Sequence, residues 1–188
     1  MEFHFELLSG AIYTAARGRV EVNVKTLVKK DVAANELFPF VREVINHGHK
    51  ARFTISGSSM CPWMIDNRDQ VLIAGSKELK PGDIILYQNS RGNYILHRIM
   101  KKEENGFRTM GDSCITADEE LITPKEVIGV VQKIYRNGKE IDCSSTFWQL
   151  VFLLWRSLLP VRNELLRLYH TLVRIKFEIG KRKSGLGA

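Results

Sequence analysis

The fold is decided by residues 70–100, which read QVLIAGSKELKPGDIILYQNSRGNYILHRIM. Three short runs rich in β-branched and aromatic residues lie at 70–74, 84–88 and 94–100, which is the composition of strands. The turn KPGD at 80–83 precedes the second run, and the turn SRGN precedes the third. These connections are too short for crossover helices, so the stretch predicts antiparallel strands rather than strand–helix–strand units.

Further strands are expected on both sides of this stretch. Residues 52–56 run into a Gly-Ser bend, an Asn-Gly hairpin signal precedes 107–110, and the run 127–135 ends at a second Asn-Gly pair. Residues 1–25 alternate weakly, as a hairpin or an edge strand would. Five or six strands at this spacing predict a mainly β (α+β) fold built on a small antiparallel domain.

Helices are expected before and after the strands. Apolar residues recur at helical spacing over 31–48, where Asp31 can cap the start and Gly48 can stop the helix. Residues 147–183 keep one apolar and one cationic face, and Pro160 should break this segment. The chain therefore divides into an N-terminal strand/helix extension (1–50), a β-domain (51–143) and a basic amphipathic helical tail (144–188).

Composition restricts the partners and the setting. The net charge of +7 fits an anionic partner. The chain has three cysteines, a small and odd number that does not favour a disulfide framework. No apolar run reaches the roughly 18 residues of a spanning helix, and the first residues lack the apolar core of a secretory signal. We therefore expect a cytoplasmic or peripherally membrane-associated protein.

A candidate nucleophile lies in the run ISGSSMCP at 55–62. A serine nucleophile needs a tightly turned backbone, so that its hydroxyl projects and nearby N–H groups can stabilise an oxyanion. Gly57 gives that freedom, and Ser59 stands two residues later. The pattern by itself is also typical of an ordinary turn.

Four more segments follow this run in an order that resembles type I signal peptidases and their LexA-type relatives. The resemblance covers roughly residues 51–134 and implies the same small β-fold and a serine-peptidase activity. Its segments are GSSMCP at 57–62, DQVL at 69–72, KPGDII at 80–85, YILHRI at 94–99, and Gly111-Asp112 with Asp118 six positions after Asp112.

The fourth segment indicates the type of mechanism. Bacterial signal peptidases and LexA-type repressors place a lysine base on this strand, whereas the endoplasmic-reticulum and archaeal type places a histidine there. This chain has His97, whose neutral imidazole can accept a proton near neutral pH. The resemblance implies Asp118 as the acid that orients His97, in preference to Asp112, which also resembles a turn carboxylate.

The resemblance also implies a substrate site around the nucleophile. Oxyanion and substrate contacts are expected from Ile55, Gly57, Ser58 and Met60, and the strand 53–55 could pair with an extended peptide. Arg68 stands where the family has a turn glycine, so a different local turn is expected there.

Three functions follow from these residues. The first is a serine endopeptidase of the signal peptidase I type that cleaves a precursor or leader peptide, with Ser59 as nucleophile and His97 as base. The second is a LexA-like regulator that cleaves its own chain, and the third is a non-catalytic peptide-binding module.

The expected partners follow from the same residues. No metal-ligand spacing or phosphate loop is present in the sequence, so we expect no metal and no cofactor. A nucleic-acid partner is not expected. Residues 147–183 fit either an anionic membrane surface or packing on the β-domain or a second subunit.

Overall fold

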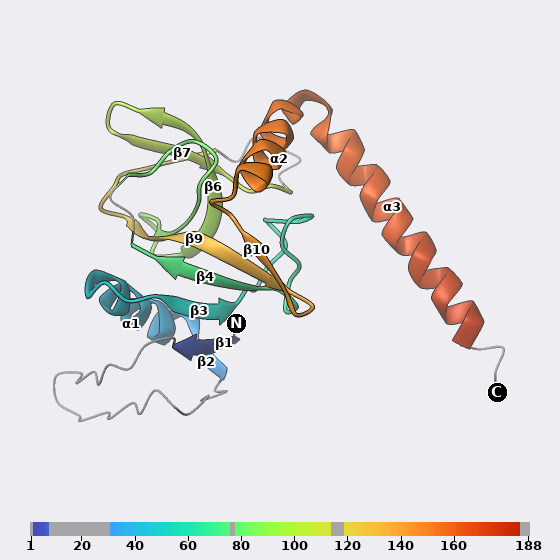
Figure 1. Ribbon diagram of the computed structural model, residues 1–188, viewed down its shortest axis with the longest axis horizontal. Coiled ribbons are helices and arrows are strands. Elements are labelled where there is room, and N and C mark those ends of the chain that lie inside the picture. The colour runs from blue at the N-terminus through green and yellow to red at the C-terminus, as the bar shows by residue number, and fades with distance from the viewer. Residues whose placement is uncertain (1, 8–30, 76–77, 114–118, 185–188) are drawn as a thin grey trace.

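The computed structural model describes residues 2–7, 31–75, 78–113 and 119–184. In these residues the chain forms a strongly curved sheet with one helix at its lower edge, and two further helices follow the last strand (Figure 1). The elements in chain order are β1 (Glu2–Leu7), β2 (Asp31–Ala33), α1 (Ala34–Asn46), β3 (Ala51–Thr54), β4 (Gln70–Ala74), β5 (Ile84–Gln88), β6 (Tyr94–Glu103), β7 (Gly106–Met110), β8 (Glu120–Ile122), β9 (Val127–Arg136), β10 (Lys139–Asp142), α2 (Thr146–Ser157) and α3 (Leu159–Ser184).

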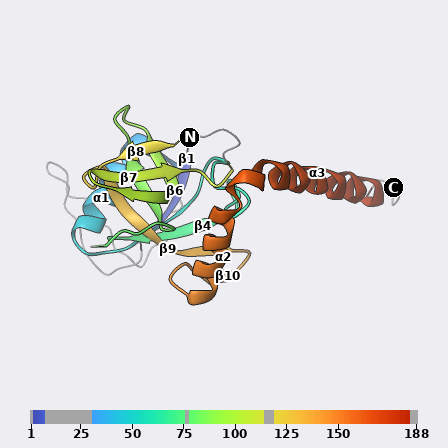
Figure 2. The ribbon, with the colours of Figure 1, turned by 90° about the horizontal axis from the view of Figure 1, so that it is seen from above.

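The sheet is antiparallel at every pairing of the described strands, which confirms the mainly β fold. Its order is β2-β1-β3-β4-β9-β5-β6-β7-β8, with β10 paired to β9. The register shifts within β4–β9, β5–β9 and β6–β7, and such irregularities bend and twist strands. The result is a sheet that curls around its own core (Figure 2).

Strand β5 separates two apolar clusters. Ile84 and Leu86 pack into the larger cluster, with residues of α1, β3, β4 and β9, while Ile85 and Tyr87 pack into a smaller one with β6 to β8. All four side chains are buried. A strand covered on both faces reads as a continuous apolar run rather than an alternating one, as residues 84–87 do.

Helix α1 begins three residues later than the sequence predicts. Asp31 was expected to cap the helix, but it lies in β2, in register with His4 of β1. Backbone pairing with a distant strand therefore replaces the local cap. The end of the helix is confirmed, because Gly48 has φ +81° and donates its N–H to the carbonyl of Ile45. Residues 8–25 of the weakly predicted N-terminal hairpin lie outside the described residues.

The strand 53–55, which the sequence suggested could pair with an extended peptide, is already occupied at Phe53. Phe53 is in register with Phe5 of β1 on one side and with Val71 of β4 on the other. Because a strand paired on both sides has no unpaired backbone groups left there, β3 cannot accept a peptide at Phe53.

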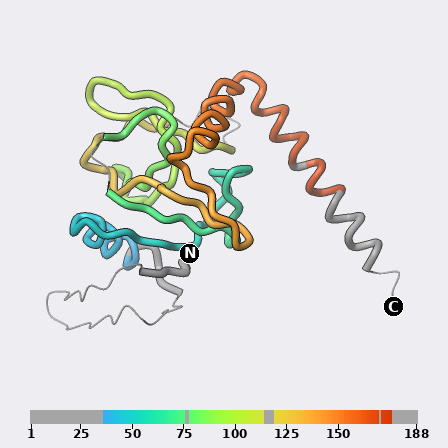
Figure 3. Tube along the Cα trace, viewed as in Figure 1, coloured from blue at the N-terminus to red at the C-terminus, as the bar shows by residue number. Residues whose placement is uncertain are grey.

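The C-terminal segment forms two helices, as the sequence predicts. Ser145 caps α2, the break falls at Leu158, and Pro160 lies in the first turn of α3, where its missing N–H costs nothing. Helix α3 leads away from the sheet (Figure 3). In the described part of the chain, no helix combines the length and the apolar character needed to cross a bilayer.

Candidate active site

The loop between β3 and β4 carries Ser59. Backbone bonds close its base, since Ile55 N–H donates to the carbonyl of Asp69 and Asn67 N–H donates to that of Ile55, each at 3.0 Å. Gly57 has φ +102°, a conformation that disfavours any side chain, and its N–H donates to Asp66 Oδ1 at 2.8 Å. Gly57 thus shapes the loop, and a carboxylate already occupies its N–H.

Asp69 fastens this loop to the sheet. Its buried carboxylate accepts the N–H of Ile65 at 3.0 Å and guanidinium bonds from Arg68 and from Arg136 of β9. Burial by itself would raise the pKa of Asp69, but these donors outweigh it and hold the pKa below its ordinary value. Arg68, the residue that replaces the expected turn glycine, is thus part of this anchor. The left-handed position is taken by Asn67 instead, with φ +54°.

Ser59 and His97 line one pocket of about 280 Å³. The loop brings Ser59 to it from the end of β3, and β6 brings His97 from the neighbouring part of the sheet. The other lining residues are mostly apolar and come from α1, β3, the Ser59 loop, β5 and β6: Phe38, Phe53, Ile55, Ser56, Gly57, Met60, Leu86, Tyr94, Ile95 and Leu96. The fold therefore unites two segments that are 38 positions apart in sequence.

Of the four residues that were expected to contact substrate, three line the pocket and Ser58 does not. Ile55, Gly57 and Met60 line the pocket with Ser59, whereas the side chain of Ser58 is exposed and its carbonyl accepts the N–H of Cys61. Ser58 thus closes the turn that contains Ser59.

A polar chain approaches His97 from the core. His97 Nδ1 lies 3.4 Å from the hydroxyl of the buried Tyr87, and that hydroxyl donates to Glu120 Oε2 at 2.9 Å. Asn89 Nδ2 donates to Glu120 Oε1 at 3.0 Å, and the hydroxyl of Thr109 lies 3.1 Å from that of Tyr87. His97 is therefore linked through a tyrosine to a carboxylate held on both oxygens.

Sequence reasoning missed both members of this link. The sequence presents Tyr87 only as part of an apolar strand. Glu120 lies in β8, whose three residues are too few to show the alternation of apolar and polar side chains that identifies a strand. One signal was available. Tyr87 pairs with Ile95, and His97 stands two positions further along β6. Residues two apart on a strand share a face, so a hairpin through residues 90–93 places both rings on one side of the sheet.

Comparison with known families settles the class of this fold. The Peptidase S24-like family model matches residues 16–132, more than half of the chain. The chain belongs to this family. Comparison with curated proteins finds no significant match. Membership establishes an S24-type serine-peptidase fold, the fold group that the resemblance to LexA and signal peptidase indicated.

Asp112 of this Peptidase S24-like chain is engaged in a buried ion pair. Arg98 Nε donates to its Oδ1 at 2.9 Å and Arg98 Nη2 to its Oδ2 at 2.6 Å. Arg98 also donates to the carbonyl of Gly82 at 2.8 Å and lies over the ring of Phe152 of α2. Arg98 thus joins β6, the 80–83 turn and α2, and Asp112 holds its guanidinium in place. Asp118, the other candidate acid, lies outside the described residues.

The segment around Asp112 nevertheless reaches the loop that carries Ser59. Ser113 N–H donates to the carbonyl of Ser59 at 2.8 Å. Three of the segments that resemble the family, those of Ser59, His97 and Asp112, therefore meet in one region of the S24-type fold.

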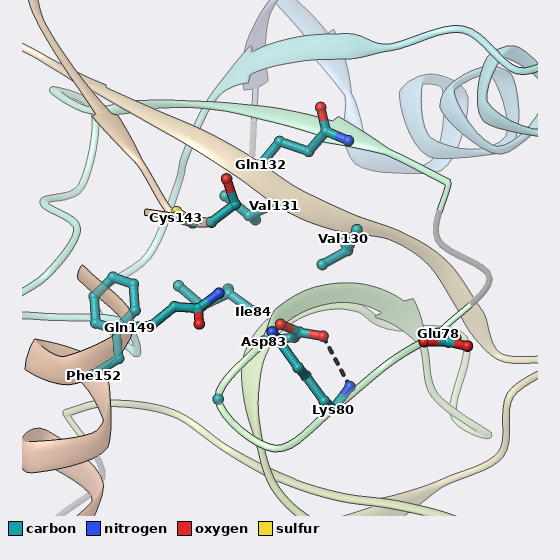
Figure 4. Close-up of a pocket in the computed structure, with 12 residues that line it drawn as sticks. Glu78, Lys80, Asp83, Ile84, Val130, Val131, Gln132, Cys143, Gln149 and Phe152 are labelled. Carbon is teal, nitrogen blue, oxygen red and sulfur yellow. Dashed lines mark hydrogen bonds between the residues drawn. The ribbon is translucent and has the colours of Figure 1, made fainter. Parts of the chain in front are cut away.

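A second pocket, of about 220 Å³, lies between the 80–83 turn, β9 and α2 (Figure 4). It contains Cys143, whose pKa burial raises to about 12, and Asp83, whose pKa burial also raises. A thiol with such a pKa stays protonated near neutral pH and is a poor nucleophile. This pocket of the S24-like domain is therefore a weaker candidate for covalent chemistry than the one lined by Ser59.

In the four described ranges, no three or more His, Cys, Asp and Glu side chains are grouped so as to hold a metal ion.

Proposed function

We propose that this chain is a serine endopeptidase of the signal-peptidase type, which cleaves a precursor or leader peptide with Ser59 as nucleophile and His97 as general base. The observation that carries the proposal is that Ser59 and His97 line the same pocket of an S24-type fold. The Ser59 hydroxyl attacks the peptide carbonyl, and His97 takes its proton and returns it to the leaving amine. The N–H groups of Ser59 and Met60 are the proposed oxyanion donors.

In this proposal His97 is a base of the endoplasmic-reticulum and archaeal type. The hydroxyl of the buried Tyr87 favours one tautomer of the His97 imidazole. When Nδ1–H of His97 faces the Tyr87 hydroxyl, the Tyr87 proton is directed to Glu120. A neutral imidazole protonated at Nδ1 carries its lone pair on Nε2, which is then the basic atom.

The acid of the triad is proposed to be Asp118, on the strength of the resemblance; as a second acceptor for the Nδ1–H of His97 it would favour the same tautomer as the Tyr87 hydroxyl. Both carboxylate oxygens of Asp112 accept bonds from Arg98, so we assign Asp112 a structural role.

The proposed substrate is an extended peptide with small or apolar residues near the cut. Residues 94–97 of β6 pair with β5 on one side, whereas the described register between β6 and β7 starts at Arg98. Tyr94, Ile95 and Leu96 line the pocket, and a peptide backbone bound there would pair with this part of β6 by strand addition. The apolar walls formed by Phe53, Ile55 and Leu96 would take its side chains.

The proposal is tested by incubating a diverse peptide pool with the wild type, with Ser59→Ala and with Ser58→Ala, followed by mass spectrometry. Loss of the nucleophile removes covalent catalysis, so we expect Ser59→Ala to lower cleavage by at least about 10³-fold. Ser58→Ala is the matched control, because Ser58 is exposed beside the same turn and should keep most activity.

Cleavage by Ser59→Ala at the wild-type rate would contradict the proposal. Peptides retained on the wild type without any cut would favour the binding module instead.

A self-cleaving regulator is the second candidate, favoured by the match to a family model that also covers residues 16–50, ahead of the β-domain. Long incubation of the purified chain at alkaline pH distinguishes it. Two complementary fragments, absent from Ser59→Ala, would support self-cleavage, and an unchanged intact mass would exclude it.

A further inference from the structure

The outward surface of α2 is apolar although the helix is already packed. Its inner side rests on Trp63, whose ring meets those of Trp148, Phe152 and Trp155 edge to face at 5.6–6.1 Å. Arg156, the one charged residue of α2, donates to the carbonyl of Met100 and so points to the domain. The opposite side, here called the outer face of α2, consists of Phe147, Leu150, Leu153 and Leu154, which are 53–65% exposed.

Helix α3 carries a second exposed apolar row. The residues of this row are spaced by four, three, four and three positions, which keeps them on one side of the helix. The opening turns of α3 are held on a different side, through the buried Arg162 and Leu166. The row, here called the α3 stripe, consists of Val161, Leu165, Leu168, Leu172 and Ile175, all 38–56% exposed.

The charge of the protein is concentrated in these same helices. Residues 146–184 contain eight basic and two acidic residues, a net charge of +6, while the whole chain has +7. The rest of the chain is therefore nearly neutral. Glu164, one of the two acidic residues, is paired with Arg167 at 2.7 Å. The segment combines a continuous cationic character with two exposed apolar faces.

We propose that α2 and α3 form a docking surface for an anionic lipid bilayer, with both helices lying in the plane of its interface. The outer face of α2 and the α3 stripe would enter the boundary between headgroups and acyl chains, and the basic residues would contact lipid phosphates. Along the whole length of the 26-residue helix α3, a bilayer can bury the apolar side chains and place lipid phosphates beside the cationic ones. The inference is independent of catalysis, since it concerns residues outside the pocket of Ser59 and His97.

Charge argues against a second copy of this chain as the occupant. Pairing two α3 stripes would bring two segments of +6 together, and like charges at close range oppose association. Spanning is also disfavoured for these residues, because the arginines recur along α3 and the helix does not meet the requirements for a bilayer crossing.

The test is co-sedimentation of the full chain with vesicles of phosphatidylcholine alone and of phosphatidylcholine with phosphatidylglycerol. We expect binding to the anionic vesicles only. The variant Arg167→Gln/Arg174→Gln should weaken it by roughly 25-fold, at about fivefold per arginine. Leu165→Ser/Leu168→Ser should weaken it by roughly 100-fold, at about tenfold per leucine.

The matched control is Leu121→Ser, which removes an equally exposed leucine from β8. It should bind anionic vesicles like the wild type. Circular dichroism of each variant verifies that α2 and α3 remain folded.

Wild-type binding to neither vesicle would overturn the proposal, as would binding that the leucine and arginine variants leave unchanged. Sedimentation equilibrium adds an independent arm. A dimer that the Leu165→Ser/Leu168→Ser variant abolishes, without vesicle binding, would assign the stripe to a second copy instead.

Discussion

The hydroxyl of Tyr87 is the atom that connects the candidate base to a carboxylate. It lies 3.4 Å from His97 Nδ1 and donates to Glu120 at 2.9 Å. Tyr87 does not line the pocket, so it would act through His97 as a positioning residue. Its side chain is fully buried, which limits the orientations of the hydroxyl and gives the imidazole a fixed partner.

We expect Tyr87→Phe to lower kcat roughly tenfold with little change in KM, because the imidazole loses the partner of its Nδ1 while the pocket walls stay in place. Nitrogen-15 spectra of His97 provide a readout that needs no activity, since its Nδ1-protonated tautomer should be depleted in the variant. Tyr135→Phe, on β9, is the control. If Asp118→Asn shifts the tautomer and Tyr87→Phe does not, the orienting role belongs to Asp118 alone.

At the scale of elements, the Ser59 loop depends on one buried carboxylate. Asp69 ties the end of the loop to β9 through Arg136, which also donates to the carbonyl of Trp63. Trp63 in turn supports α2 through edge-to-face contacts with its aromatic rings. The position of the nucleophile and the attachment of α2 therefore share an anchor.

We expect Asp69→Asn to lower the free energy of unfolding near neutral pH by about 2 kcal/mol, the scale of a charge-assisted hydrogen bond. The depressed pKa of Asp69 means that its stabilisation is full above its ordinary pKa and is lost as pH falls through the lowered value. Urea unfolding between about pH 7 and pH 2 should thus show a steeper acid loss for the wild type than for the variant.

Glu140→Gln, which breaks an exposed pair with Lys133, is the control and should change the unfolding curve little. Equal acid sensitivity of the wild type and Asp69→Asn would show that Asp69 is not the titrating anchor.

At the scale of the whole molecule, a nearly neutral S24-like domain carries a cationic helical arm. Helix α3 also influences the Ser59 loop, because burial raises the pKa of the Cys61 thiol and a hydrogen bond with Tyr169 of α3 opposes that rise in its pKa. The arm that would meet the bilayer thus contacts the loop that holds Ser59. A membrane-bound substrate would be met by a protein already held at that surface.

Because most of the net positive charge lies in α2 and α3, salt should weaken vesicle binding more than peptide cleavage. Raising NaCl from about 0.05 M to about 0.5 M shortens the screening length severalfold, so vesicle binding should fall by more than about tenfold. Cleavage of a short uncharged peptide without vesicles should change little, because the pocket is mostly apolar. A parallel loss of both activities would place the salt effect in the domain rather than in the helices.

The local patterns of the sequence were sufficient for most of the longer strands and for the helices, and they suggested the candidate nucleophile and base, but they did not indicate the short strands β2, β8 and β10. Turns at residues 80–83 and 90–93, the stop at Gly48 and the break near Pro160 depend on neighbouring residues, so a linear reading finds them. The ordered segments around Ser59 and His97 likewise indicated the family, because several short segments in one order are hard to obtain by chance.

Tertiary structure alone decided which groups meet across the sheet. The pairing of Asp112 with Arg98, the link from His97 through Tyr87 to Glu120, and the occupation of the β3 edge by β1 each join residues through strand register. Register is set by the packing of the whole core, and a shift of one residue would turn each side chain to the opposite face. No local pattern contains that information.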